Sequence, residues 1–140
     1  MNNLILLELN EINFDAVSFY IARGKYLPGF KKLIQKGIVT TESEPKYENI
    51  EPWIQWPSVH TGKTFDEHNV FRLGDFVNSS DGQFFEKVES AGFSVGAISP
   101  MNASNQLINP AYFIPDPWTK TPCDESFFSN SISDAIVQAV

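Results

Sequence analysis

The stretch Glu51–Phe71, EPWIQWPSVHTGKTFDEHNVF, decides which fold this sequence predicts. It begins with Glu-Pro, a pair typical of a helix start, because the first turn of a helix has N–H groups without partners and proline has no N–H to lose. Apolar residues follow at helical spacing, and Thr61-Gly62 ends the run. A polar loop then leads to His68 and an apolar pair. We therefore predict a short apolar helix, a tight turn, and a loop that carries a histidine.

Apolar runs that resemble strands alternate with segments of helical spacing along the rest of the chain. Asn13 and Asp81 are predicted helix caps, and Pro28 is a predicted first-turn proline. The predicted helices are residues 13–23, 28–36, 81–91 and 131–140. The predicted strands are residues 4–9, 38–41 and 93–98, with a short extended piece at 112–114. This alternation predicts an α/β fold, a three-layer sandwich with a mostly parallel sheet.

Length and composition limit the class of protein. With 140 residues, 42% of them hydrophobic, the chain has room for one domain with a core, and we take residues 1–140 as that domain. A net charge of −7 argues against a nucleic-acid partner, because binding to phosphates starts from clustered Lys and Arg. The last predicted helix carries no stop signal, so we expect an incomplete N-terminal portion of a larger domain.

The cysteine count and the N-terminal segment bear on the compartment. The single cysteine, Cys123, excludes an internal disulfide. The segment MNNLILLELN has no basic region, and Glu8 interrupts its apolar run. We therefore expect neither a signal peptide nor a membrane span, no membrane partner, and a cytoplasmic location.

Leu4–Leu9 and three later segments, in the same order and with similar spacing, resemble the alkaline phosphatase superfamily in its nucleotide pyrophosphatase/phosphodiesterase branch, with Leu4–Leu9 similar to the first strand of that family. Leu27–Leu33 (LPGFKKL) is similar to an early helix of that family, and Ala91–Gly96 (AGFSVG) to a later helix end and strand. Within the central stretch the matching residues are Trp56, Ser58, Thr61, Gly62, His68 and Phe71. The resemblance implies an alkaline-phosphatase-like fold, of which this chain is the N-terminal part, and a metal-dependent hydrolase of phosphoesters.

That family uses a pair of divalent metal ions, Zn²⁺ or Mn²⁺, which clamp the phosphoryl group while a Thr or Ser hydroxyl attacks it. The first-strand Asp of the family falls here on Asn10, with Glu11 next to it, so these two residues are the metal-ligand candidates. The nucleophile position falls on Pro52, which has no nucleophilic group, and the neighbouring Glu51 is the catalytic candidate. The alternative for Glu51-Pro52 is an ordinary helix start, and for Asn10 and Glu11 a polar turn.

Three residues are candidates for binding a substrate. Trp53 lies one position past the nucleophile position and could line a pocket. Asn102 and Asn105 follow a predicted strand end, which is where α/β proteins usually bind ligands. Ser58 has no His-Asp arrangement or nucleophile elbow around it, so we give it no catalytic role. For His60 and His68 we expect structural hydrogen bonding, with His68 anchoring its loop.

Two hypotheses on function follow. In the first, the chain is a fragment or a divergent form of a metal-dependent phosphodiesterase or pyrophosphatase, with little or no activity on its own. The substrate would be a small phosphorylated molecule, or a nucleotide- or sugar-linked one. In the second, it is a non-catalytic module of the same fold that binds a ligand or a protein partner, since two catalytic positions, Asn10 and Pro52, are altered independently. We also expect self-association through apolar surface meant for the missing half of the domain.

Overall fold

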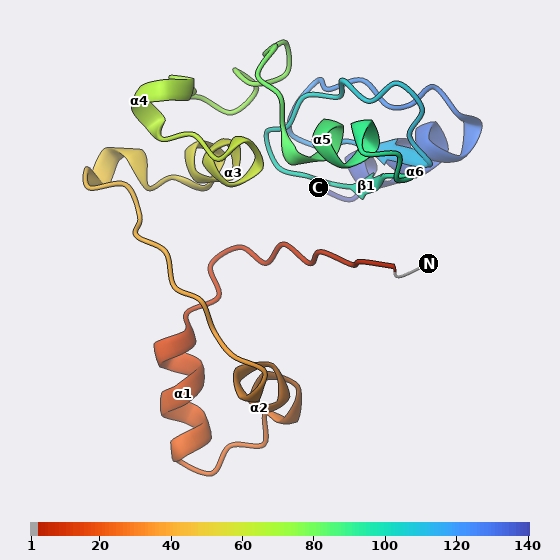
Figure 1. The fold of residues 1–140 in the computed structure, drawn as a ribbon. Helices are drawn as coiled ribbons and strands as arrows, with labels where there is room; N and C mark the ends of the chain where they lie inside the picture. The colour runs from red at the N-terminus through yellow and green to blue at the C-terminus, as the bar shows by residue number, and fades with distance from the viewer. Residues whose placement is uncertain (1–2) are drawn as a thin grey trace. The chain divides into compact units, whose positions relative to one another are not determined.

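The structure is a computed structural model that describes residues 3–140. The chain forms two compact units, one ending at Ser43 and the other beginning at Glu44. The described residues contain six α-helices, one short 3₁₀ helix and a two-stranded parallel sheet (Figure 1). None of the described helices is long and apolar enough to cross a membrane.

The first unit contains helices α1 (Phe14–Ala22) and α2 (Pro28–Gln35). Asn13 caps α1 as predicted, since its side-chain Oδ1 accepts a hydrogen bond from Ala16 N at 2.9 Å. Pro28 opens α2, also as predicted. The two helices meet through the rings of Phe14 and Phe30, which lie edge to face with centroids 6.3 Å apart.

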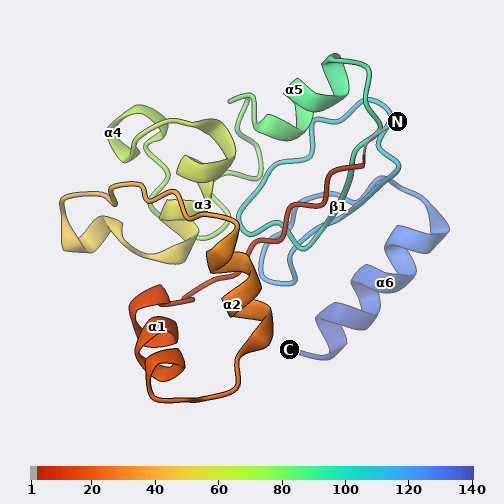
Figure 2. The same ribbon diagram turned by 60° about the horizontal axis from the view of Figure 1, so that its bottom comes forward.

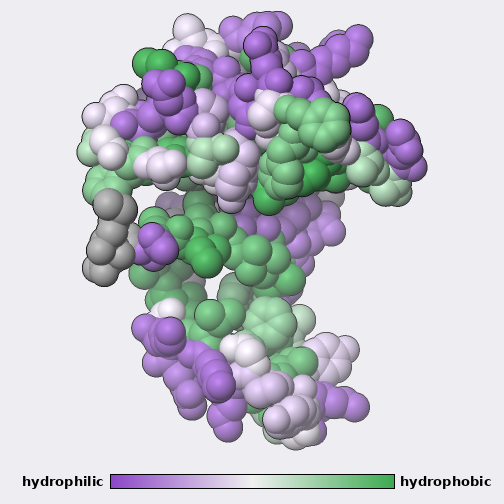
Figure 3. All heavy atoms as spheres, turned by 90° about the vertical axis from the view of Figure 1, so that its right-hand side faces the viewer, coloured by the Kyte–Doolittle hydropathy of each residue, from purple (hydrophilic) through white to green (hydrophobic). Residues whose placement is uncertain are grey.

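The two apolar runs of this unit form no strand in the structure. Residues 4–9 and 38–41 have no ladder partner, although their composition predicts strands. Leu4 is 90% exposed and Leu7 is 72% exposed. In Figure 3, hydrophobic residues are exposed alongside large hydrophilic areas. A β-strand depends on a neighbouring strand for its hydrogen bonds, so composition alone does not fix it.

The second unit begins with the 3₁₀ helix η1 (Tyr47–Asn49) and the helix α3 (Pro52–Thr61). Gly62 ends α3 with a positive φ of 73°, in the left-handed region that glycine adopts without strain. The short helix α4 (Phe65–His68) follows and packs against α3. The predicted helix and turn of the central stretch are therefore present, whereas His68, predicted in a polar loop, ends the short helix α4.

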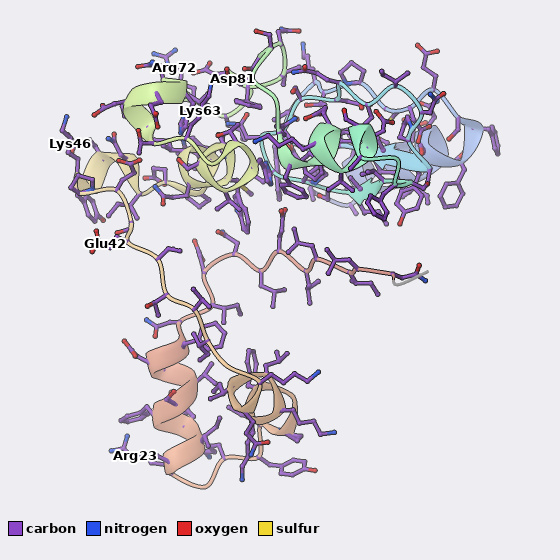
Figure 4. The ribbon with its side chains drawn as sticks, in the orientation of Figure 1. Arg23, Glu42, Lys46, Lys63, Arg72 and Asp81 are labelled. Carbon is purple, nitrogen blue, oxygen red and sulfur yellow. The ribbon has the colours of Figure 1, made fainter. Side chains whose placement is uncertain are left out.

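The N-cap of helix α5 (Phe84–Ser90) is Gln83, and not the predicted Asp81. The N–H of Gln83 donates to the Glu86 side chain at 2.7 Å, which satisfies a group at the helix start. The Asp81 carboxylate instead accepts a hydrogen bond from Lys63 Nζ at 2.5 Å (Figure 4). The ion pair joins the segment before α4 to the segment before α5.

The sheet pairs β1 (Gly96–Ile98) with β2 (Tyr112–Ile114) in parallel, with Ala97 opposite Phe113. The predicted strand at 93–98 is thus shorter than expected, whereas the one at 112–114 is confirmed. Helix α6 (Phe127–Gln138) packs against β2 (Figure 2). The core between α5 and the sheet consists of Phe85, Val95, Ala97, Ala103 and Phe113.

The connection from β1 to β2, residues 99–111, contains no helix. Parallel strands need a long crossover, and here side chains hold it in place. The carboxylate of Glu89 in α5 accepts hydrogen bonds from the N–H groups of Ile108 and Asn109, at 2.8 and 2.7 Å. Gln83 Nε2 donates to the carbonyl oxygen of Ser104 at 2.9 Å. Because of these bonds the crossover is ordered and can position the residues that follow β1.

Candidate ligand pocket at the start of helix α3

A pocket of about 630 Å³ lies at the start of α3 in the second unit. Its wall is formed by η1, by the first turn of α3 and by the segment 71–73 that follows α4. The lining residues are Tyr47, Glu48, Glu51, Trp53, Ile54, Phe71, Arg72 and Leu73. Aromatic rings and aliphatic groups make up most of this wall, with two carboxylates and one guanidinium. The pocket is largely open to solvent, and its mostly apolar wall offers a surface on which a small organic molecule can pack.

The ring of Trp53 is fixed against the opposite wall. Its indole N–H donates a hydrogen bond to the carbonyl oxygen of Phe71 at 3.2 Å. Trp53 is only half-buried, so part of the indole faces the pocket. A ring that is held in place loses little freedom when a ligand packs on it, which favours binding.

Asn102 does not line the pocket but bonds to both of its walls. Its side chain is fully buried, and its Nδ2 donates to the carbonyl oxygens of Trp53 at 2.7 Å and Arg72 at 3.3 Å. The side-chain Oδ1 accepts the N–H of Gly74 at 2.9 Å. The amide thus bonds to the first turn of α3 and to the segment after α4 at the same time.

The bond to Trp53 replaces one that α3 cannot make. In a regular α-helix the carbonyl of Trp53 would accept the N–H of residue 57, four positions on. That residue is Pro57, which has no N–H. Asn102 Nδ2 satisfies the carbonyl instead. This explains how a proline is tolerated inside α3.

Asp116 in turn holds Asn102. The buried Asp116 carboxylate accepts the backbone N–H of Asn102 at 2.9 Å, and the N–H groups of Trp118 and Thr119 at 2.8 and 2.9 Å. Asn102 itself has a φ of +50°, which asparagine tolerates better than most residues. The loop after β1 and the loop after β2 therefore position the residue that braces the pocket.

Glu51 stands at the pocket, at the N-cap of α3, with its side chain exposed and not used to cap the helix. Pro52 has no N–H, and the N–H groups of Ile54 and Gln55 already donate to the carbonyl oxygen of Glu51, at 2.9 and 3.0 Å. The start of α3 is thus poorly equipped to hold an anion with its backbone. Arg72 is the cationic group of the pocket wall (Figure 4).

His68 uses both ring nitrogens within the protein, as expected for a loop anchor. Nδ1 accepts the N–H of Val70 at 2.9 Å, and Nε2 lies 2.9 Å from Ser58 Oγ. Since Nδ1 is an acceptor, the proton of the neutral ring is on Nε2, which donates to Ser58. The ring therefore cannot take a proton from Ser58. This arrangement is structural, and it differs from that of a Ser-His catalytic pair.

The remaining predicted site residues lie elsewhere. Asn105 donates from Nδ2 to the carbonyl oxygen of Pro122 at 3.1 Å and does not line the pocket. Asn10 and Glu11 form an exposed turn in the first unit. The structure therefore brings Glu51, Trp53 and Asn102 together. Glu51 and Trp53 line the pocket, and Asn102 bonds to the backbone of its walls.

Asn10 and Glu11 alone do not fit a pair of divalent metal ions. They offer only two ligand side chains and one negative charge, whereas each Zn²⁺ takes about four ligands and each Mn²⁺ about six. Within residues 3–140, no three His, Cys, Asp or Glu side chains are grouped so that they could hold a metal ion. The Zn²⁺ or Mn²⁺ pair stays a prediction.

Sequence reasoning did not identify Tyr47 and Arg72 as pocket residues. Both lie outside the segments that follow strands, and no motif marks them. Phe71 was noted only for its place in the family pattern. The one local signal was the proline inside α3, which implies an unsatisfied carbonyl four residues earlier.

Comparison of the chain with protein-family models, with curated proteins and with solved structures found no match.

Proposed function

We propose that this chain binds a small nucleotide- or sugar-linked phosphoester in the pocket at the start of α3, as a module without catalytic activity of its own. The observation that carries the proposal is the pocket itself, where the Phe71 carbonyl holds the Trp53 ring, Asn102 holds the Trp53 backbone carbonyl, and the cationic Arg72 lies in the wall. The resemblance to the phosphodiesterase branch of the alkaline phosphatase superfamily supports the same class of ligand.

Each chemical part of such a ligand has a matching group in the wall. A planar base can stack on Trp53 or Phe71, and base–aromatic stacking contributes about 1–3 kcal/mol per base. The guanidinium of Arg72 can pair with a phosphate. Ribose or sugar hydroxyls can donate to the carboxylates of Glu48 and Glu51. Because these carboxylates repel a phosphate, we expect the phosphate to lie toward Arg72.

Binding is favoured over hydrolysis by the residues at the start of α3. Pro52 occupies the position where the family has its nucleophile, and the backbone N–H groups of Ile54 and Gln55 are already used. A hydrolase is the second candidate, because Glu51 lines the pocket with a carboxylate that does not cap the helix. A carboxylate can act as a nucleophile.

The test is a calorimetric titration of the full chain with AMP, with adenosine and with a nucleoside diphosphate sugar. Arg72→Gln should weaken AMP binding by about tenfold and leave adenosine unchanged, since a charged hydrogen bond contributes about 1.5–3 kcal/mol. Lys87→Gln is the matched control, because Lys87 is exposed on α5 and away from the pocket lining. No binding of any of the three molecules would refute the proposal.

A second pair of variants tests the aromatic wall. Trp53→Leu should weaken both AMP and adenosine by at least about fivefold, from the lower end of the stacking contribution. Trp118→Leu serves as the control, since Trp118 is exposed and does not line the pocket. Release of p-nitrophenol from bis(p-nitrophenyl) phosphate with Zn²⁺ or Mn²⁺ present, abolished by Glu51→Gln, would favour the hydrolase instead.

A further inference from the structure

His68 lies at the start of one wall of the pocket. Its Nδ1 accepts the N–H of Val70, and Val70 directly precedes the lining residues Phe71, Arg72 and Leu73. The carbonyl oxygen of Phe71 then accepts the indole N–H of Trp53. The histidine ring and the Trp53 ring are therefore connected through two consecutive residues of backbone, Val70 and Phe71.

We propose that His68 is a pH-sensitive latch on this wall: the neutral ring holds segment 69–73 in place, and protonation of the ring releases it. This inference rests on the proposed function for its biological meaning, because the wall it controls is that of the ligand pocket.

The latch depends on the direction of the hydrogen bonds. A protonated imidazole has an N–H on both nitrogens and no acceptor. The Val70 N–H would then face a second N–H at Nδ1, so an attractive contact becomes a repulsive one. The contact with Ser58 survives, since Nε2 carries its proton in both states and the hydroxyl oxygen accepts it. Protonation therefore acts selectively on the side of the ring that faces the pocket segment.

The surroundings of the ring determine where it titrates. His68 is 8% exposed, and this burial lowers the pKa of its imidazole. The carboxylates of Glu44, Asp81 and Glu67 act in the opposite direction and raise the pKa, whereas the ammonium of Lys63 lowers it. The ring of Phe65, whose centroid lies 5.9 Å from that of the imidazole, and the Ser58 hydroxyl complete its surroundings. The net effect is a pKa below the usual histidine value, so the latch should be closed at neutral pH.

The first experiment needs no ligand and no mutation. We would follow the full chain by NMR from pH 8 to pH 5 and record the ring signals of His68, the amide of Val70 and the indole N–H of Trp53. The latch predicts one midpoint, below pH 6.5, shared by all three signals. A Val70 amide and a Trp53 indole that stay unchanged while His68 titrates would overturn it.

Two variants make the assignment specific. His68→Asn keeps a side-chain oxygen near the position of Nδ1 but does not titrate, so the shared midpoint at Trp53 should disappear. Ser58→Ala is the matched control, because it removes the partner of Nε2 and leaves the Val70 contact, so the midpoint should remain. A midpoint at Trp53 that persists in His68→Asn would place the switch elsewhere and refute the latch.

The last measurement links the latch to binding. In the wild-type chain, adenosine affinity should fall by about tenfold between pH 7.5 and pH 5, and in His68→Asn it should stay within about twofold over this range, because adenosine has no phosphate that titrates there. Binding that is equally independent of pH in both proteins would refute the regulation. Absence of both adenosine and AMP binding at every pH would refute the proposed function, and the ligand-free NMR titration would still decide whether the latch exists.

Discussion

Replacement of Asn102 tests the role of this residue as the brace of the pocket. Its side chain makes three hydrogen bonds, to Gly74 N, Trp53 O and Arg72 O. At a net contribution of about 1 kcal/mol each, Asn102→Gly should lower the free energy of unfolding by about 3 kcal/mol. Asn102→Ala should cost about 1 kcal/mol more, because φ is +50° and a Cβ is strained in the left-handed region.

The assay is urea unfolding followed by circular dichroism, with Asn105→Ala as the control. Asn105 makes only partly exposed contacts, so its replacement should cost less than about 1 kcal/mol. Exchange of the Trp53 indole proton with solvent should also become faster in Asn102→Gly. The assigned role of Asn102 would be refuted if both replacements lowered the free energy of unfolding by less than about 1 kcal/mol, or if the alanine variant were the more stable of the two.

Two further predictions concern the sheet and the helix that packs on it. Burial alone would raise the pKa of Asp124, but hydrogen bonds from Ser126, Ser129 and the Phe113 N–H outweigh it and lower the pKa to about 2. Because the folded-state pKa lies below the ordinary value, the stabilisation is complete above about pH 4 and is lost as the pH falls toward 2. Asp124→Asn should therefore lower Tm at pH 7 and have a smaller effect at pH 2.5, and an equal loss at both pH values would contradict this. Gly96→Ala should lower the free energy of unfolding, measured by urea titration, by at least about 2 kcal/mol, because a Cβ at residue 96 would overlap the ring of Tyr112. A loss below about 0.5 kcal/mol would show that the ring moves aside at little cost.

The helices of this protein were largely predictable because their signals are local. Asn13, Pro28 and Gly62 act on groups within four residues of themselves, and each is found where the sequence predicts it. The cap of α5 was misplaced because Asp81 and Gln83 are both polar, and the choice depends on Lys63, eighteen residues away, which pairs with Asp81. The three-layer sandwich and the relation to alkaline phosphatases stay predictions.

The candidate site was only partly predictable, for a related reason. Glu51 and Trp53 were selected from their place next to Pro52, and both line the pocket. Asn102 was selected as a ligand contact because it follows a strand end, but its amide is fully buried and bonded within the chain. The sequence shows that Pro57 leaves a carbonyl without a donor. It does not show which residue supplies that donor, because the bond spans 49 residues.

The proline inside α3 also has a consequence for the order of folding. A helix normally closes its own hydrogen bonds, so it can form early and independently of the rest of the chain. Here the first turn of α3 is completed by a side chain 49 positions later, in the crossover that follows β1. Helix α3 therefore depends on a contact between residues far apart in the sequence, as the strands of a sheet do. Its first turn becomes fully bonded only once the strand and its crossover have docked, which couples formation of the pocket wall to formation of the core.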